Sequence, residues 1–257
     1  MDRTRPALAF RPPSLLRLGL AVVLVAALLG VGRLAADGMA ARTGPDSPGR
    51  GAGQLTGGTP AISTATHGAL PPCAYGDVVA ELDGYVDWAS TILDTTYRLP
   101  SEYVPPDLVA IKDPEGGSGR VRAFVRAPLL ELLSAARRSG ETITVASAYR
   151  SYAQQVSVFD SLETAYGRDF ALLSAARPGH SEHQLGTAVD FEGGDDWLAG
   201  NAWRYGFARS YPPDRSPERT CYKFEPWHFR YVGVDRAAAI HASGLSPREW
   251  LWRNTGG

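Results

Sequence analysis

The first 72 residues limit the fold most, because they consist of one short apolar run and a long stretch with few large apolar side chains. An uncharged apolar run, Leu18–Gly32, follows several arginines and stops at Arg33. Residues 37–72 are then dense in Gly, Pro, Ser and Thr and hold almost no large apolar side chains, so they cannot bury enough surface to fold. The folded part of the chain is therefore expected within residues 73–257.

The apolar run has the pattern of an export signal. It is shorter than the roughly 20 residues that span a membrane, and Gly38-Met39-Ala40 offers a cleavage site of the small-x-small kind. The alternative is an uncleaved segment that anchors the protein in the plasma membrane. We expect residues 1–36 to be a signal peptide or signal anchor and residues 37–72 a flexible tether. The rest would be extracytoplasmic, secreted or anchored, touching the membrane only through the N-terminal segment.

Charge and cysteine content narrow the function further. The net charge is -1 and the basic residues are scattered, which argues against nucleic acid as a partner. We expect a monomer.

The only cysteines are Cys73 and Cys221, and an even count in an exported protein predicts one disulfide, with two free buried thiols as the alternative.

Hydrophobic patterning from Cys73 onward predicts one α+β domain, with a small, mainly antiparallel sheet flanked by helices. Apolar residues at helical spacing between residues 75 and 100 predict a helix there. Alternating or β-branched runs predict strands, and the remaining helices are expected from apolar spacing that ends at glycine. The expected strands are 142–150, 186–191 and 226–233, and the further expected helices are 128–140 and 151–167.

Two of these strands carry side chains that can bind a metal. Strand alternation places Asp190 on a face opposite Val189, and places His228 and Arg230 together on one face of the other strand. A histidine in the loop before Asp190 would supply a third N/O ligand, a set that catalytic zinc sites commonly use. Spacing alone leaves open whether that histidine is His180 or His183. A turn cap for Asp190 and a structural role for His228 are the alternatives.

Three blocks of this sequence resemble the zinc D-alanyl-D-alanine carboxypeptidases of the VanY type, in the M15 peptidase family. The likeness covers roughly residues 73–252. The blocks are SEHQLGTAVD (181–190), similar to Ser-x-His-x-x-Gly-x-Ala-x-Asp, EPWHFRYVG (225–233), similar to Glu-x-Trp-His, and SAYRSYAQQ (147–155), which has alanine at 148 where glycine is usual. The resemblance implies a fold like that of hedgehog and D-Ala-D-Ala peptidases.

The resemblance also implies roles for particular residues. One zinc ion per chain would be bound by His183, Asp190 and His228, with Glu225 as the general acid/base. Strict alternation would separate Glu225 from His228, so we expect Glu225 to precede the regular strand, with Pro226 allowing a bend. Arg150, Ser181 and Gln155 would bind substrate, with Gln154 as the alternative to Gln155, and a salt bridge and a turn cap as the alternatives for Arg150 and Ser181.

These residues predict hydrolysis of the terminal D-Ala-D-Ala bond of peptidoglycan stem peptides. An L,D-carboxypeptidase or cell-wall endopeptidase on the same scaffold is the first alternative, because pocket residues and not the ligands choose the bond. A zinc-stabilised cell-wall binding module without catalysis is the second, and an intact Glu225 argues against it. A Ser/His/Asp hydrolase is disfavoured because no Gly-x-Ser-x-Gly motif occurs.

Overall fold

The computed structural model describes residues 68–80, 87–112 and 117–255. The expected export segment and residues 37–67 of the expected tether lie outside these ranges. The last tether residues, 68–72, contact the C-terminal helix α7 (Pro247–Thr255): the Trp252 indole donates to the Gly68 carbonyl (3.0 Å), and Arg248 to that of Pro71 (3.0 Å). No helix within the described ranges is both long and apolar enough to cross a membrane.

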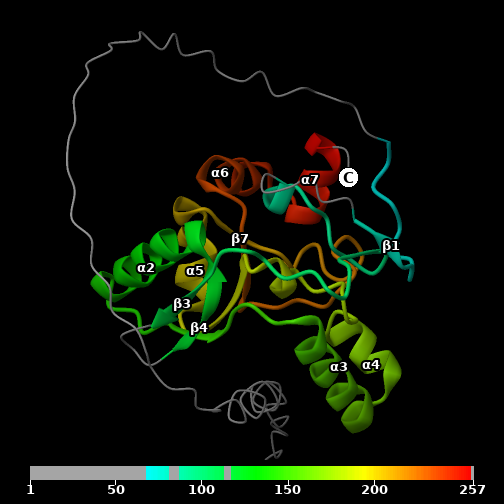
Figure 1. Cartoon of the computed structure of the whole chain (residues 1–257). Coiled ribbons are helices and arrows are strands. Elements are labelled where there is room, and N and C mark those ends of the chain that lie inside the picture. The colour runs from blue at the N-terminus through cyan, green and yellow to red at the C-terminus, as the bar shows by residue number, and fades with distance from the viewer. Residues whose placement is uncertain (1–67, 81–86, 113–116, 256–257) are drawn as a thin grey trace, which may run out of the picture.

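The predicted α+β class is confirmed: six helices and three small sheets make up the described part (Figure 1). The central sheet is fully antiparallel, with strand order β5-β6-β8-β7. Its strands are β5 (Thr144–Ser147), β6 (Ala188–Glu192), β7 (Phe207–Arg209) and β8 (His228–Tyr231). The other strands form a parallel pair, β1 (Val78–Val79) with β2 (Tyr97–Arg98), and a hairpin, β3 (Leu108–Lys112) with β4 (Ser118–Arg122).

The helices surround this sheet. Their bounds, with three short 3-10 turns, are η2 (Asp87–Ala89), α2 (Ala123–Arg138), α3 (Tyr152–Tyr166), α4 (Arg168–Ser174), η3 (Glu182–Leu185), α5 (Asp195–Asn201), η4 (Ala202–Tyr205) and α6 (Val234–Ser243). Helices α3 and α4 lie side by side as a hairpin that projects from the rest of the domain (Figure 1).

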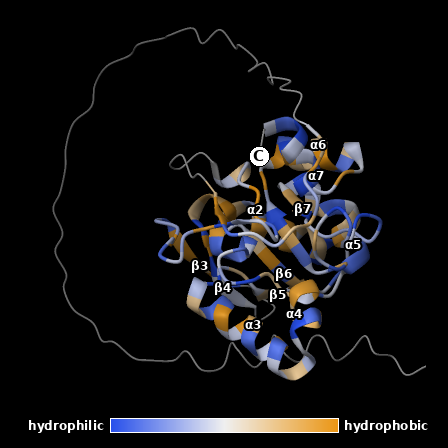
Figure 2. Ribbon diagram, turned by 90° about the vertical axis from the view of Figure 1, so that its right-hand side faces the viewer, coloured by the Kyte–Doolittle hydropathy of each residue, from blue (hydrophilic) through white to orange (hydrophobic). Residues whose placement is uncertain are grey.

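The main core lies between α2 and one face of the central sheet. Buried side chains of α2, such as Leu129 and Leu132, belong to the same cluster as Val189, Phe191 and Phe229 of the sheet. Figure 2 shows these hydrophobic stretches at the centre of the domain. Because side chains alternate along a strand, Asp190 and His228 are left on the opposite face. The expected alternation in β6 and β8 is therefore confirmed.

Helix α2 begins five residues before the position expected from Pro128. Val125 lies one turn before Leu129 and is fully buried with it, so the apolar stripe continues on both sides of the proline. Proline inside a helix costs one hydrogen bond, and burial of this stripe outweighs that cost. Helix α3 begins where expected: Ser151 and Gln154 form a reciprocal capping box at its N-terminus.

The prediction of a helix between residues 75 and 100 is wrong for the part of this range that the structure describes. Val78 and Val79 pair in parallel with Tyr97 and Arg98, and only a short 3-10 turn follows at Asp87–Ala89. The Asp94 carboxylate accepts hydrogen bonds from the backbone N–H groups of Thr96 (2.7 Å) and Tyr97 (3.0 Å). Hydrogen bonds from nearby backbone N–H groups to a side chain compete with the backbone hydrogen bonds of a helix. Here they form at Asp94 despite the helical spacing of the apolar residues.

Candidate active site

Three buried side chains converge on the sheet face opposite the main core. His183 lies in the turn η3, Asp190 in β6 and His228 at the start of β8. Asp190 and His228 are direct cross-strand partners, and the turn η3 leads back into β6. One ligand atom from each residue lies within 4.8 Å of the others. The structure thus assembles a three-residue cluster that can hold a metal ion.

Hydrogen bonds determine which ring nitrogen of each histidine faces the cluster. His183 Nδ1 lies 2.6 Å from the Ala148 carbonyl, so Nδ1 carries a proton and Nε2 points to Asp190 Oδ2 at 3.1 Å. In His228 the orientation is reversed: Nε2 lies 2.9 Å from a carboxylate oxygen of Glu182, and Nδ1 lies 3.0 Å from Asp190 Oδ1. Each imidazole therefore has one nitrogen held by the protein and the other directed at Asp190.

The donor set fits zinc. Two imidazole nitrogens and one carboxylate oxygen are common ligands of catalytic zinc, which leaves a further position open. Burial lowers the pKa of His183, which favours the neutral form that a metal needs. Burial opposes ionisation of Asp190, but the two histidines hold its pKa below the usual range and keep the carboxylate charged. For His228, burial is outweighed by Asp190 and Glu182, which raise its pKa to about 10, so a metal ion must displace that proton.

Glu225 lies beside the cluster, in the segment before β8, as expected from Pro226. Its Oε2 is 4.0 Å from His228 Nδ1, and the residue is only 9% exposed. Burial raises the pKa of Glu225 to about 7. A carboxyl group with a pKa near neutrality can both accept and return a proton, as a general acid/base must.

Arg150 also reaches the cluster, from the loop between β5 and α3. Its guanidinium donates to Gln155 Oε1 (2.7 Å) and to Ser147 Oγ (3.1 Å), and lies 3.5 Å from Asp190 Oδ2. Gln155 is 1% exposed and donates to the Ala176 carbonyl (2.6 Å). Gln155 thus holds Arg150 in place; its predicted contact with substrate stays a prediction. Gln154, the alternative, is exposed and forms the capping box of α3 with Ser151.

Ser181 is the residue before η3 and is buried. Its side chain does not cap the turn, and none of the described residues forms a hydrogen bond with its hydroxyl group. The hydroxyl is therefore available to a ligand, and the turn-cap alternative does not describe it.

His180 lies apart from the cluster. Its Nδ1 is 2.7 Å from the Asp94 carbonyl, and its Nε2 is 3.3 Å from Asp77 Oδ1. The ambiguity between the two histidines of this loop is thus resolved by geometry, because only His183 lies among the clustered residues.

Sequence reasoning missed the partners of Glu182. This buried carboxylate binds His228, accepts from Ser210 Oγ (2.6 Å) and pairs with Arg230 Nη1 (3.0 Å). Burial alone would raise the pKa of Glu182, but Arg230, His228 and Ser210 lower it to about 2. The sequence offered one signal for this contact, the shared strand face of His228 and Arg230. A buried arginine on that face needs an acidic partner, which predicts a buried carboxylate nearby.

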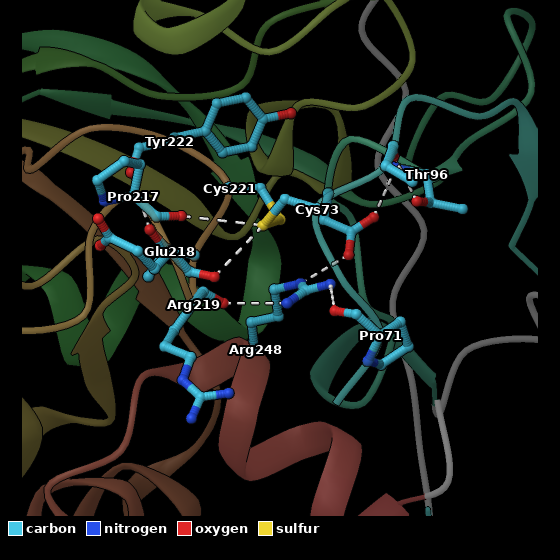
Figure 3. Close-up of a disulfide and its surroundings, with 12 residues drawn as sticks. Pro71, Cys73, Thr96, Pro217, Glu218, Arg219, Cys221, Tyr222 and Arg248 are labelled. Atoms are coloured by element: carbon cyan, nitrogen blue, oxygen red, sulfur yellow. Dashed lines mark hydrogen bonds and ion pairs between the residues drawn. A yellow bond between two sulfur atoms is a disulfide. The ribbon is translucent and has the colours of Figure 1, made fainter. Parts of the chain in front are cut away.

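Cys73 and Cys221 are joined by a disulfide in the structure (Figure 3). Beside them, Arg248 of α7 donates to Asp94 (2.6 Å), to the Arg219 carbonyl and to the Pro71 carbonyl. These contacts join the start of the domain to the segment that leads to Glu225, four residues after Cys221.

The fold and the buried His/Asp/His cluster, with a carboxylic acid beside it, are those of a zinc peptidase domain. A family model described as VanY: D-alanyl-D-alanine carboxypeptidase matches residues 119–234. The chain belongs to this VanY family of D-alanyl-D-alanine carboxypeptidases, in agreement with the resemblance found in the sequence.

Individual relatives support this assignment. A D-alanyl-D-alanine carboxypeptidase of Enterococcus faecalis is 34% identical over 183 residues, covering 64% of this chain and 66% of that protein. The structure of VanYB in complex with D-Alanine-D-Alanine has a TM-score of 0.58 and 32% identity, covering 66% of this chain and 99% of the other. A VanY D,D-pentapeptidase in complex with Zn(II) has a TM-score of 0.57 and 32% identity, covering 64% and 99%. The chain spans 66% of the length of the first curated relatives that it matches.

Proposed function

We propose that this protein is a zinc D,D-carboxypeptidase that removes the terminal D-Ala from peptidoglycan stem peptides ending in D-Ala-D-Ala. The observation that carries the proposal is the buried cluster of His183, Asp190 and His228, with the Glu225 carboxyl 4.0 Å from His228. Its relatives named D-alanyl-D-alanine carboxypeptidase and the VanYB complex with D-Alanine-D-Alanine support the choice of substrate.

Each protein group then has a distinct task. Zinc, when bound by the three ligands, supplies a Lewis acid that polarises the scissile carbonyl and lowers the pKa of water. Glu225 accepts the proton from the attacking water and delivers it to the nitrogen of the departing D-Ala. Arg150 and Ser181 hold the C-terminal carboxylate: the guanidinium offers a fork of charged donors and the serine a free hydroxyl.

The direct test uses synthetic tetrapeptide and pentapeptide stems. The purified protein should release D-Ala from the pentapeptide, lose this activity in chelator and regain it when zinc is added. The amino acid released and the length of the product are measured by mass spectrometry. Release of D-Ala only from the tetrapeptide would instead indicate an L,D-carboxypeptidase, and cleavage within cross-linked wall fragments an endopeptidase. No release from any stem by the zinc-loaded protein would favour a non-catalytic binding module.

Arg150→Met should abolish the preference for a free C-terminal carboxylate. Hydrogen bonds to charged groups contribute about 1.5–3 kcal/mol, so kcat/KM for the pentapeptide acid should fall by about 10- to 100-fold. The matched substrate is the same peptide with a C-terminal amide, for which the variant and the wild type should differ little. Because Arg150 lies 3.5 Å from Asp190, zinc content is measured alongside. An equal loss on both substrates at full zinc content would contradict this role for Arg150.

We further propose that residues 1–36 export the protein and that the domain works outside the cytoplasm, as a monomer, secreted or held at the membrane by an uncleaved N-terminal segment. The apolar run and the polar tether support this proposal. Cell fractionation combined with N-terminal sequencing of the mature protein tests it: a cleaved N-terminus near Ala40 means secretion, and an intact one in the membrane fraction means anchoring. A cytoplasmic protein with an intact N-terminus would contradict export.

We expect the disulfide between Cys73 and Cys221 in the exported protein, and a large loss of stability without it. The two residues are separated by 148 positions, and closing so long a loop contributes about 4–5 kcal/mol in the chain-entropy model. Cys73→Ser and Cys221→Ser should therefore lower the denaturant midpoint to a similar extent, and the double variant should be no less stable than either. Non-reducing peptide mapping that finds both thiols free would contradict the disulfide.

A further inference from the structure

Glu182 is a buried acid whose carboxylate contacts one of the clustered histidines. Its side chain is 6% exposed, and its two oxygens meet three donors: Ser210 and His228 at Oε2 and Arg230 at Oε1. The His228 nitrogen that it binds is Nε2, on the far side of the ring from Asp190. Glu182 therefore contacts a metal ligand while its own oxygens are occupied by protein donors.

We propose that Glu182 is a positioning residue for His228: its carboxylate holds the proton on Nε2, so that Nδ1 is the nitrogen that binds the metal. This inference rests on the zinc site of the proposed function and extends it to a residue outside the ligand set. A carboxylate that accepts the second N–H of a ligating histidine fixes the ring orientation and its tautomer, and makes the ligand nitrogen more basic.

Arg230 keeps this carboxylate in place. It is 1% exposed, and its second amino group donates to the carbonyls of Trp88 (2.7 Å) and Thr91 (2.8 Å). Arg230 also lies two residues after His228, on the same face of β8. One strand therefore carries both the ligand and the cation that anchors the acid, and the charge of Glu182 is balanced inside the domain.

The two histidine ligands are held by different kinds of partner. His183 donates Nδ1–H to a neutral carbonyl, that of Ala148, whereas His228 faces a charged carboxylate. Only His228 thus depends on an ionised side chain for its tautomer. Replacement of Glu182 should therefore act on the metal through His228 and leave the His183 contact unchanged.

Glu182→Gln is the informative substitution because it keeps the shape but cannot satisfy all three donors. If the amide oxygen faces His228, the amide NH2 group faces Arg230, donor against donor. If the amide NH2 group faces His228, Nε2 must accept, and the ring proton moves to Nδ1, the nitrogen that faces Asp190. Either arrangement weakens metal binding.

We expect Glu182→Gln to weaken zinc binding by about 10- to 100-fold, as measured by competition with a chromophoric chelator. The matched control is Glu249→Gln. Glu249 is also buried and also accepts from a serine, Ser246 (3.0 Å), with an arginine nearby, Arg219 (3.7 Å), but it contacts none of the clustered residues. The control should bind zinc within about threefold of the wild type, and the melting temperatures of both metal-free variants report any general destabilisation.

A second measurement does not depend on the variant folding. Long-range proton–nitrogen NMR spectra of the zinc-loaded wild type should show His228 protonated at Nε2 and bound to metal through Nδ1. Zinc bound to His228 Nε2 would overturn the proposal, and so would zinc affinity in folded Glu182→Gln equal to that of the control. A wild type that binds zinc with the expected tautomer but releases no D-Ala would contradict the proposed function and leave this inference standing.

Discussion

Glu225→Gln should lower kcat by about 10²-fold to 10⁴-fold while zinc content stays that of the wild type. This is the range for loss of a general acid/base, and glutamine keeps the shape of the side chain without its proton chemistry. Glu225 is not one of the three clustered residues, and the groups proposed to hold the substrate, Arg150 and Ser181, are unchanged in this variant. KM should therefore change little. Steady-state kinetics on the pentapeptide, with metal analysis of the same sample, measure both quantities.

Glu192→Gln is the matched control for this experiment. Glu192 ends β6, two residues after Asp190, but its side chain is exposed, so its replacement should leave kcat near the wild-type value. A Glu225→Gln protein with full zinc content and near wild-type turnover would place the base elsewhere. Glu182 would be a poor substitute, because its oxygens are occupied by Ser210, His228 and Arg230.

His183→Ala should remove zinc, whereas His180→Ala should retain it. The first change deletes one of three ligands, so the loss of affinity should exceed the roughly 10- to 100-fold cost of losing a hydrogen-bond partner of a ligand. The second removes a ring that contacts Asp94 and Asp77 outside the cluster. Metal analysis of the two purified variants, after dialysis against the same buffered zinc concentration, gives the comparison.

The paired design separates metal loss from misfolding, because both histidines are buried and lie three residues apart. The melting temperature of each metal-free variant should fall to a similar, modest extent. Equal zinc loss in both variants, or loss only in His180→Ala, would reject the ligand assignment.

The strands that carry the site could be predicted from local pattern, whereas the segment before them could not. In β6 and β8 the apolar residues alternate with Asp190 and His228, and the core takes up the apolar face. Between residues 75 and 100 the helical spacing of apolar residues was misleading for the positions that the structure describes, which exclude residues 81–86. Val78 and Val79 find their partners at Tyr97 and Arg98, and that pairing is a tertiary contact that no local window contains.

Motif spacing predicted residues of the site, but the contacts between them required the folded chain. Ser181, His183 and Asp190 fall within one ten-residue block that resembles a family signature, so the resemblance implied a joint role for them before their positions were known. Glu182 sits in the same block, yet its partner His228 is 46 positions away. The antiparallel pairing of β6 with β8 brings the two blocks together, and no feature of either block specifies that pairing by itself.

Side-chain identity and short periodicities were enough to predict the α+β class and a histidine and carboxylate set that can bind a metal, and the family resemblance added the expected roles of the ligands and of Glu225. The tertiary structure alone decided three matters: which histidine of the loop joins the cluster, which nitrogen of each ring faces Asp190, and which buried acid beside the cluster has a raised pKa. The physical reason is that burial and hydrogen bonding set the orientation of each histidine ring and the pKa of each acid. The raised pKa of Glu225 comes from burial, and the lowered pKa of Glu182 comes from three donors that outweigh burial. Both effects depend on neighbours that only folding brings within reach.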